Sequence, residues 1–212
     1  MSSILQAVFQ NQRSFEVIPE VGSVYEGGYF AGQVMHSGTK YNLVMSPIAS
    51  GQQTTMWKAH LTSSSGTSSQ IDGPANTAAQ VALGSHYAAN FCNGRTIGGY
   101  SDWYMPSRME LNTCYYTLKK GTNGNNTGSG ANPYAVAPQP VNTNFTASDP
   151  AQTSATIFQS GNSEAHGDGA YLSSTERTTN YCYGWSMNTG ANYINVYKLN
   201  SKKVRAIRRV AA

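Results

Sequence analysis

Apolar positions in residues 107–120 recur with the period of an α-helix. The residues at positions i, i+3, i+4 and i+7 are Leu111, Cys114, Tyr115 and Leu118. Together they form one buried face of a helix. Ser107 is a good N-cap, and Glu110 stands three residues later, which is the spacing of a capping box. The pattern therefore predicts a helix over residues 107–120.

A second helix is predicted over residues 76–92. Thr77 followed by Gln80 resembles a capping box. Small residues recur at helical spacing along one stripe: Ala78, Ala82, Ser85 and Ala89. Such a stripe lets a helix lie close to a sheet. Gly84 falls inside the pattern and weakens helix formation by about 1 kcal/mol relative to alanine.

Short extended runs separated by turn residues indicate strands near both ends of the chain. The runs cover residues 24–25, 29–31, 41–45, 170–173, 182–187, 193–198 and 203–210. Turn formers at 188–190 and 200–201 make the last 40 residues a predicted meander. Neither face of the final run is cleanly apolar, so we expect one of its arginines to be buried against a carboxylate.

Residues 121–169, called the excursion below, show no clear period. The segment begins with the letters GTNGNNTGSGANP, which are nearly all turn formers. Loops of this length in a compact domain are usually functional or disordered. Four apolar residues would pin it to the core: Tyr134, Phe145, Ile157 and Phe158. We therefore predict a long, ordered surface insertion.

Composition indicates one folded domain with a neutral, hydrogen-bonding exterior. The chain has 212 residues, of which 11% are charged, against about 25% in ordinary soluble proteins. Fourteen tyrosines, six phenylalanines and three tryptophans argue against disorder. We expect residues 1–20 to form an N-terminal arm or anchor, and residues 21–212 to form the domain.

The net charge is +4, and six of the 14 basic residues lie between Lys198 and Arg209. The segment lacks a long basic run or a recognised nucleic-acid motif, so we expect no nucleic-acid partner. No secretory signal and no membrane-spanning run is visible. We expect synthesis in a host cytoplasm and no membrane insertion.

Metal and redox motifs are missing from the sequence. The three cysteines, Cys92, Cys114 and Cys182, form no CxxC pair, so we expect reduced, buried thiols and no zinc site. No calcium-lectin motif is present, and we expect neither a metal nor another cofactor. No Gly-x-Ser-x-Gly elbow, Walker loop or paired-carboxylate motif is visible. We therefore expect no enzymatic activity and no catalytic residues.

Four motifs carry a resemblance to a known family. Residues 27–30 read GGYF, residues 98–107 read GGYSDWYMPS, residues 171–176 read YLSSTE and residues 204–209 read VRAIRR. In this order they resemble the C-terminal domain of collagen-like bacterial adhesins of the Lcl type. The resemblance spans roughly residues 21–210. Leu172 stands where the family usually has tryptophan, and the excursion is longer than the family pattern.

The resemblance implies an α+β, C-type-lectin-like fold, with two helices packed on a twisted, mostly antiparallel sheet and long surface loops. Many family members are encoded by phages, which implies a virion protein here. Within the motifs we assign structural roles to Trp103, Pro106, Ser107, Glu110, Ser173, Ser174, Glu176, Arg205 and Arg208. We expect the acids Asp102, Glu110 and Glu176 to pair with Arg205 and Arg208.

The predicted function is that of a phage surface protein in a tail fibre, baseplate or head. Its loops would recognise a host glycan or protein. Candidate ligand-binding residues are Tyr181, Tyr183, Trp185, Asn188, Asn192 and Tyr193. We expect other virion proteins as partners and a homo-oligomer. Two alternatives remain: a purely architectural virion protein, and a glycan-degrading enzyme with two carboxylates in a cleft.

Overall fold

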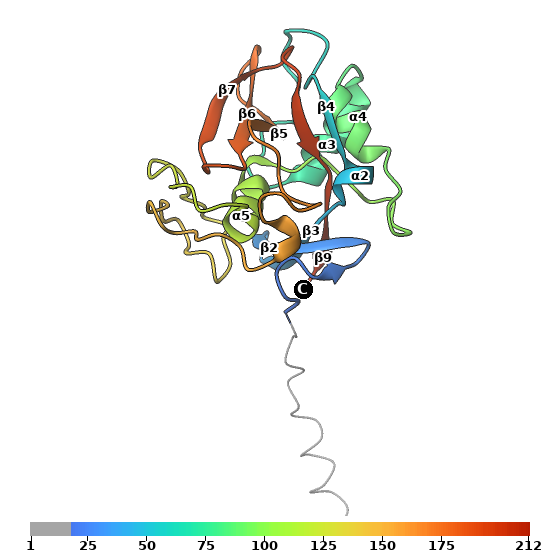
Figure 1. The fold of residues 1–212 in the computed structure, drawn as a ribbon. Helices are drawn as coiled ribbons and strands as arrows, with labels where there is room; N and C mark the ends of the chain where they lie inside the picture. The colour runs from blue at the N-terminus through green and yellow to red at the C-terminus, as the bar shows by residue number, and fades with distance from the viewer. Residues whose placement is uncertain (1–17) are drawn as a thin grey trace, which may run out of the picture.

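The computed structural model describes residues 18–212 and shows an α+β fold with two β-sheets (Figure 1). Of the predicted arm, residues 1–17 lie outside the described part. The first sheet has the antiparallel order β1 (Val24–Tyr25), β2 (Gly28–His36), β3 (Thr39–Met45) and β9 (Ile207–Ala211). The predicted strands near the start of the chain are therefore confirmed.

The second sheet contains most of the predicted C-terminal meander. Its order is β4 (Gln52–Thr55), β8 (Lys202–Arg205), β5 (Ala170–Glu176), β6 (Tyr181–Ser186) and β7 (Asn192–Tyr197). All pairs are antiparallel except β5 with β8. The single strand predicted over 203–210 is wrong. The chain leaves the second sheet at Arg205 and enters the first at Ile207, while the Ala206 amide bonds to the Gly51 carbonyl.

Helix α5 (Arg108–Leu118) confirms the helix predicted over residues 107–120. Ser107 caps it, and both hydrogen bonds of the capping box with Glu110 are present. The predicted apolar face is buried. The helix contacts β2 of the first sheet and both β5 and β6 of the second. It therefore connects the two sheets through one apolar cluster, whose members include Leu43, Leu111, Tyr115, Phe158 and Trp185.

The helix predicted over 76–92 is two helices, α3 (Gly73–Leu83) and α4 (Tyr87–Asn93). Gly84 and Ser85 both have positive φ, and they end α3. Asp72 is the N-cap of α3, so the capping box predicted at Thr77 and Gln80 is wrong. The predicted small-residue stripe is wrong too, because most of it faces solvent, and the buried side of α3 is polar: Asn76, Thr77 and Gln80.

A second apolar cluster lies among α4, β5, β6 and β8, and it includes Trp57, Trp103, Leu172, Cys182 and Val204. Two short elements complete the fold, α2 (Ile48–Gly51) and the 3-10 helix η1 (Thr156–Phe158). All three cysteines are free and buried, as predicted. Burial raises the pKa of each thiol well above its ordinary value.

Candidate functional site

The segments carrying the sequence motifs lie together. The Ser174 amide donates to the Pro106 carbonyl at 2.7 Å. Tyr104 and Ile207 exchange two backbone hydrogen bonds, at 2.8 and 3.0 Å. The segment before α5 therefore joins β5 of the second sheet to β9 of the first. Trp103, next to Tyr104, is 1% exposed and lies in the core, so the structural role assigned to it is confirmed.

Arg208 confirms the predicted pairing of motif acids with motif arginines. Its guanidinium binds both carboxylate oxygens of Asp102, at 2.7 and 2.9 Å. Such two-point pairs fix geometry as well as charge. Glu110 does not follow the prediction. Its carboxylate is fully buried and accepts hydrogen bonds from the Ser107 amide at 2.8 Å and the Tyr104 hydroxyl at 2.5 Å. The Glu110 side chain therefore stabilises the start of α5, and the predicted pairing of Glu110 with an arginine is wrong.

Arg205 is buried against a carboxylate, as expected for one arginine of the final run, but its partner lies in the excursion. It is 1% exposed and forms an ion pair with Glu164. Glu164 also accepts a hydrogen bond from the Ile48 amide at 2.9 Å. Burial lowers the pKa of Arg205 to about 10. The pair fastens the excursion to β8, and sequence reasoning missed it because Glu164 belongs to no motif.

Glu176 pairs with a lysine, so the predicted arginine partner is wrong. Lys198 is fully buried, forms an ion pair with Glu176 and donates to the carbonyls of Thr62 at 3.1 Å and Thr179 at 2.8 Å. The Glu176 carboxylate also accepts from the Ser64 amide at 2.9 Å. These contacts of Glu176 therefore hold the loop around Ser64 against β5.

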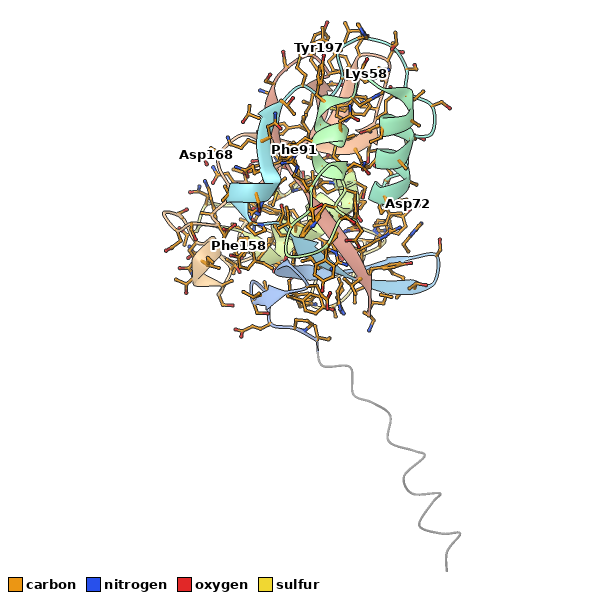
Figure 2. The ribbon with its side chains drawn as sticks, turned by 90° about the vertical axis from the view of Figure 1, so that its right-hand side faces the viewer. Lys58, Asp72, Phe91, Phe158, Asp168 and Tyr197 are labelled. Carbon is orange, nitrogen blue, oxygen red and sulfur yellow. The ribbon has the colours of Figure 1, made fainter. Side chains whose placement is uncertain are left out.

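A buried polar cluster adjoins this pair and was not predicted. Ser64 Oγ lies 2.8 Å from His86 Nε2 and accepts from Lys58 Nζ at 2.9 Å. His86 Nδ1 lies 2.5 Å from the Gly84 carbonyl oxygen. Desolvation lowers the pKa of both His86 and Lys58. His86 and Ser64 are buried, so the cluster fixes this end of the molecule, where Figure 2 shows Lys58 and Tyr197 together.

The excursion follows α5 and has little regular structure, yet buried amides anchor it. Asn132 is fully buried, and its side-chain nitrogen lies within 3.2 Å of three acceptors on α5, at Met109, Asn112 and Thr113. Gln139 is also buried and donates to Asn112 Oδ1 at 2.5 Å. These neutral hydrogen bonds hold the first half of the excursion against the helix.

Further anchors hold the middle and end of the excursion. Asn125 accepts from the Tyr115 hydroxyl at 2.5 Å and donates to the Pro150 carbonyl at 2.9 Å. Lys119 Nζ donates to the same carbonyl at 3.0 Å. The predicted apolar anchors Phe145 and Phe158 are buried, with exposed fractions of 4% and 0%. The excursion is therefore ordered and packed onto the domain.

The excursion and the turn between β6 and β7, where turn formers were predicted at 188–190, adjoin. The Asn126 amide donates to the Thr189 carbonyl at 2.8 Å, and Asn123 donates to Asn188 Oδ1 at 3.0 Å. The exposed residues of 122–128 and 140–149, together with 188–189, are called the loop surface below. Figure 1 shows the excursion extending outward beside α5.

The candidate ligand residues do not form one cluster. Trp185 is 1% exposed and packs edge-on against Phe145 beneath the loop surface. It anchors the loops and cannot meet a ligand at the surface, so its predicted ligand-binding role is wrong. Tyr183 lies under the Arg108 guanidinium, 4.7 Å from it, and Asn192 accepts from Arg108 Nε at 3.2 Å.

The other candidates lie at the margins of the second sheet. Asn188 belongs to the loop surface, and Tyr181 packs edge-on against Tyr197. Tyr193 is 41% exposed. It lines a groove of about 370 Å³ together with Gly169, Ala170, Asn195, Val196, Tyr197, Asn200 and Lys202. The structure therefore leaves Asn188 and Tyr193 as the best-placed candidates, at two separate places.

Comparison with known proteins gave no match among family models, curated proteins or solved structures. Within residues 18–212, no helix is long and apolar enough to cross a membrane. In the same part of the chain, no three His, Cys, Asp or Glu side chains lie close enough to hold a metal ion. The most distinctive feature for function is the anchored loop surface.

Proposed function

We propose that this chain is a recognition domain on the surface of a phage particle. In this proposal a C-type-lectin-like scaffold presents the loop surface to a glycan or protein on the host cell. The phage assignment and the lectin-like assignment rest on the sequence motifs. The adjoining positions of residues 102–110, 173–176 and 205–208 support a common scaffold.

The observation that carries the recognition role is the buried anchoring of the excursion. A loop that is already ordered loses less conformational entropy when it binds, so more of the contact energy appears as affinity. Binding residues in proteins often lie on loops that a rigid scaffold positions. Buried amides such as Asn125 and Asn132 give this excursion that order without a helix or strand.

The chemistry of the loop surface fits a hydrogen-bonding partner. Its polar side chains are mainly Asn and Thr, with Asp149 as its charged residue and Val141, 59% exposed, as its large apolar one. Asn and Ser provide adaptable hydrogen bonds in other loop-based binding surfaces. Hydroxyl groups of a glycan or the backbone of a protein are suitable partners for such groups.

Binding of the labelled protein to a panel of whole bacterial cells tests the proposal by flow cytometry. The key variant places three arginines on the loop surface, through Thr127→Arg, Val141→Arg and Ser148→Arg. A matched control places the same charge on the exposed side of α3, through Ala75→Arg, Ala78→Arg and Ala82→Arg. We expect the loop variant to lose about tenfold or more in affinity and the α3 control to keep it.

Two outcomes contradict the recognition role. One is equal binding by the loop variant and the α3 control. The other is a folded wild-type chain that binds no cell on the panel, which favours the purely architectural alternative. Release of soluble sugar from the cells would instead favour the enzyme alternative.

A further inference from the structure

The four outer edges of the two sheets differ in how they discourage pairing with another strand. Edge β1 has two residues. Edge β9 carries Arg208 and Arg209, and Tyr104 bridges to its first residue. Edge β4 has four residues, all polar. Short length and charge are the usual protections of a sheet edge.

Edge β7 is neither short nor charged, although one extra residue between Tyr193 and Val196 forms a bulge against β6. It has six residues, reading NYINVY, with no charge and no proline. Tyr193 is 41% exposed and Ile194 is 44% exposed. Among the described strands β7 pairs with β6 alone, and Figure 1 shows it at the outer side of its sheet. An uncharged, apolar edge strand is a template for pairing with another chain.

We propose that β7 is a self-association edge, where two copies of this chain pair antiparallel about a two-fold axis and extend the second sheet. This goes beyond the proposed recognition role, because it names a surface for assembly. It does not use the loop surface.

The β7 sequence suits a second copy as its occupant. In a pairing centred on Ile194, the Ile194 side chains of the two copies, each 44% exposed in the single chain, lie opposite one another. Aromatic and β-branched residues opposite one another stabilise sheets. In a symmetric pair each β7 strand lies beside an identical strand, so a charge on β7 would lie close to the same charge on the other copy. An uncharged strand avoids this repulsion, and β7 carries no charge.

One exposed cation near the edge sets the expected salt dependence. Arg177 lies beside β7 and donates a hydrogen bond to the Asn195 side chain. In the symmetric pair the two Arg177 side chains approach one another, and salt screens their repulsion. Association should therefore strengthen as the salt concentration rises, which is the opposite of a salt-bridged interface.

The interface is small, so the expected affinity is low. A pair of six-residue strands buries less than the roughly 1,200 Å² of a stable interface. We therefore expect dissociation constants on the order of 0.1 mM. Attachment of many copies to one particle raises their local concentration to about this range.

Sedimentation velocity on the full chain tests this, from about 1 µM to about 1 mM. We expect monomers at the lower end and dimers at the upper end. Ile194→Lys places a charge on the edge and should give monomers throughout. Leu83→Lys is the matched control, since Leu83 is 52% exposed and lies at the end of α3. It should associate like the wild type.

Deuterium exchange at both ends of this range adds a readout specific to strand pairing. The β7 amides should gain protection as the wild-type chain dimerises, and circular dichroism checks that each variant is folded. The proposal is overturned if the wild-type chain stays monomeric, or if Ile194→Lys associates as strongly as Leu83→Lys. Cell binding measured at micromolar concentration should be unchanged in Ile194→Lys, so this test and the recognition test can fail separately.

Discussion

The elements that carry the sequence motifs are called the scaffold below. The scaffold and the excursion both bury many polar side chains, but the two regions differ in which kinds of side chain they bury. Around the motifs the buried polar groups include ionisable ones, namely Arg208 in its pair with the exposed Asp102, Lys198 in its pair with Glu176, and Glu110 in the capping box. In the first half of the excursion they are neutral amides on Asn125, Asn132 and Gln139. Two ion pairs join the two regions, the buried Arg205–Glu164 pair and the Lys120–Asp168 pair, whose carboxylate is exposed.

Substitutions in the two regions should differ in their cost to stability. A buried charge that loses its partner is costly, so each scaffold pair constrains the whole domain. A neutral amide costs less to lose, and the excursion divides its anchoring among several of them. Loss of one amide of the excursion should therefore loosen the excursion without unfolding the rest of the domain.

The largest expected effect comes from the scaffold. Glu110→Ala leaves the buried Ser107 amide and Tyr104 hydroxyl without their acceptor, and each unsatisfied donor costs about 1–3 kcal/mol. We expect urea unfolding to show a loss of about 2–4 kcal/mol for the whole domain. Glu20→Ala, at an exposed site, is the control. A loss no larger than that of the control would mean that the capping box does not hold α5.

A smaller and more local effect is expected in the excursion. Asn132→Ala removes the side-chain NH2 group that donates to the cluster of acceptors on α5, and we expect a cost of about 1–3 kcal/mol. Deuterium exchange should increase in residues 129–145 and stay unchanged in β5 and β8. Asn90→Ala, at an exposed site of α4, is the control. Equal loosening of the excursion and both strands would show that the two regions unfold as one unit.

The smallest effect is a dependence on pH that belongs to the excursion. His166 is 1% exposed, and neither ring nitrogen has a hydrogen-bond partner among the described residues. Burial, followed by the nearby cations Arg205 and Lys120, lowers its pKa well below the ordinary value. The unfolded chain therefore binds a proton that the folded chain does not, and stability falls as the pH drops below about 6.5.

Urea unfolding at several pH values measures this slope. We expect the wild type to lose roughly 1 kcal/mol per pH unit below about pH 6 from His166. His166→Phe should remove this part, because phenylalanine suits the contacts with Phe158 and Tyr171. His86 also has a lowered pKa and leaves a residual slope in both proteins. An identical slope in His166→Phe and wild type would contradict the assignment.

Several elements were predictable because their causes are local. The α5 cap and buried face follow from spacing within a dozen residues, and the structure confirms both. The division between α3 and α4 was harder to predict. On the scale of helix propensity, Gly84 is only a modest cost. In the structure Gly84 has a positive φ, which ends α3 and allows His86 to contact Ser64. That contact joins residues 22 positions apart and leaves no periodic signal.

The candidate site was predictable as a pair of loop regions but not as a set of residues. Asn188 lies on the loop surface, whereas Trp185, which shares its turn, is an anchor beneath it. Alternation along a strand indicates which side chains share a face. It does not indicate which face the excursion covers. Phe145, 40 positions earlier, decides that Trp185 is buried.

The sequence by itself determined the α+β class, the capped helix α5 and the strand-rich segments within residues 24–45 and 170–211. These features depend on periodicity, capping and composition, which act over short distances along the chain. Only the tertiary structure decided that Arg205 pairs with Glu164, that β8 and β9 belong to different sheets, and that the excursion meets the β6–β7 turn. These contacts join distant residues, and a buried charge is satisfied by whichever partner the packing brings within reach.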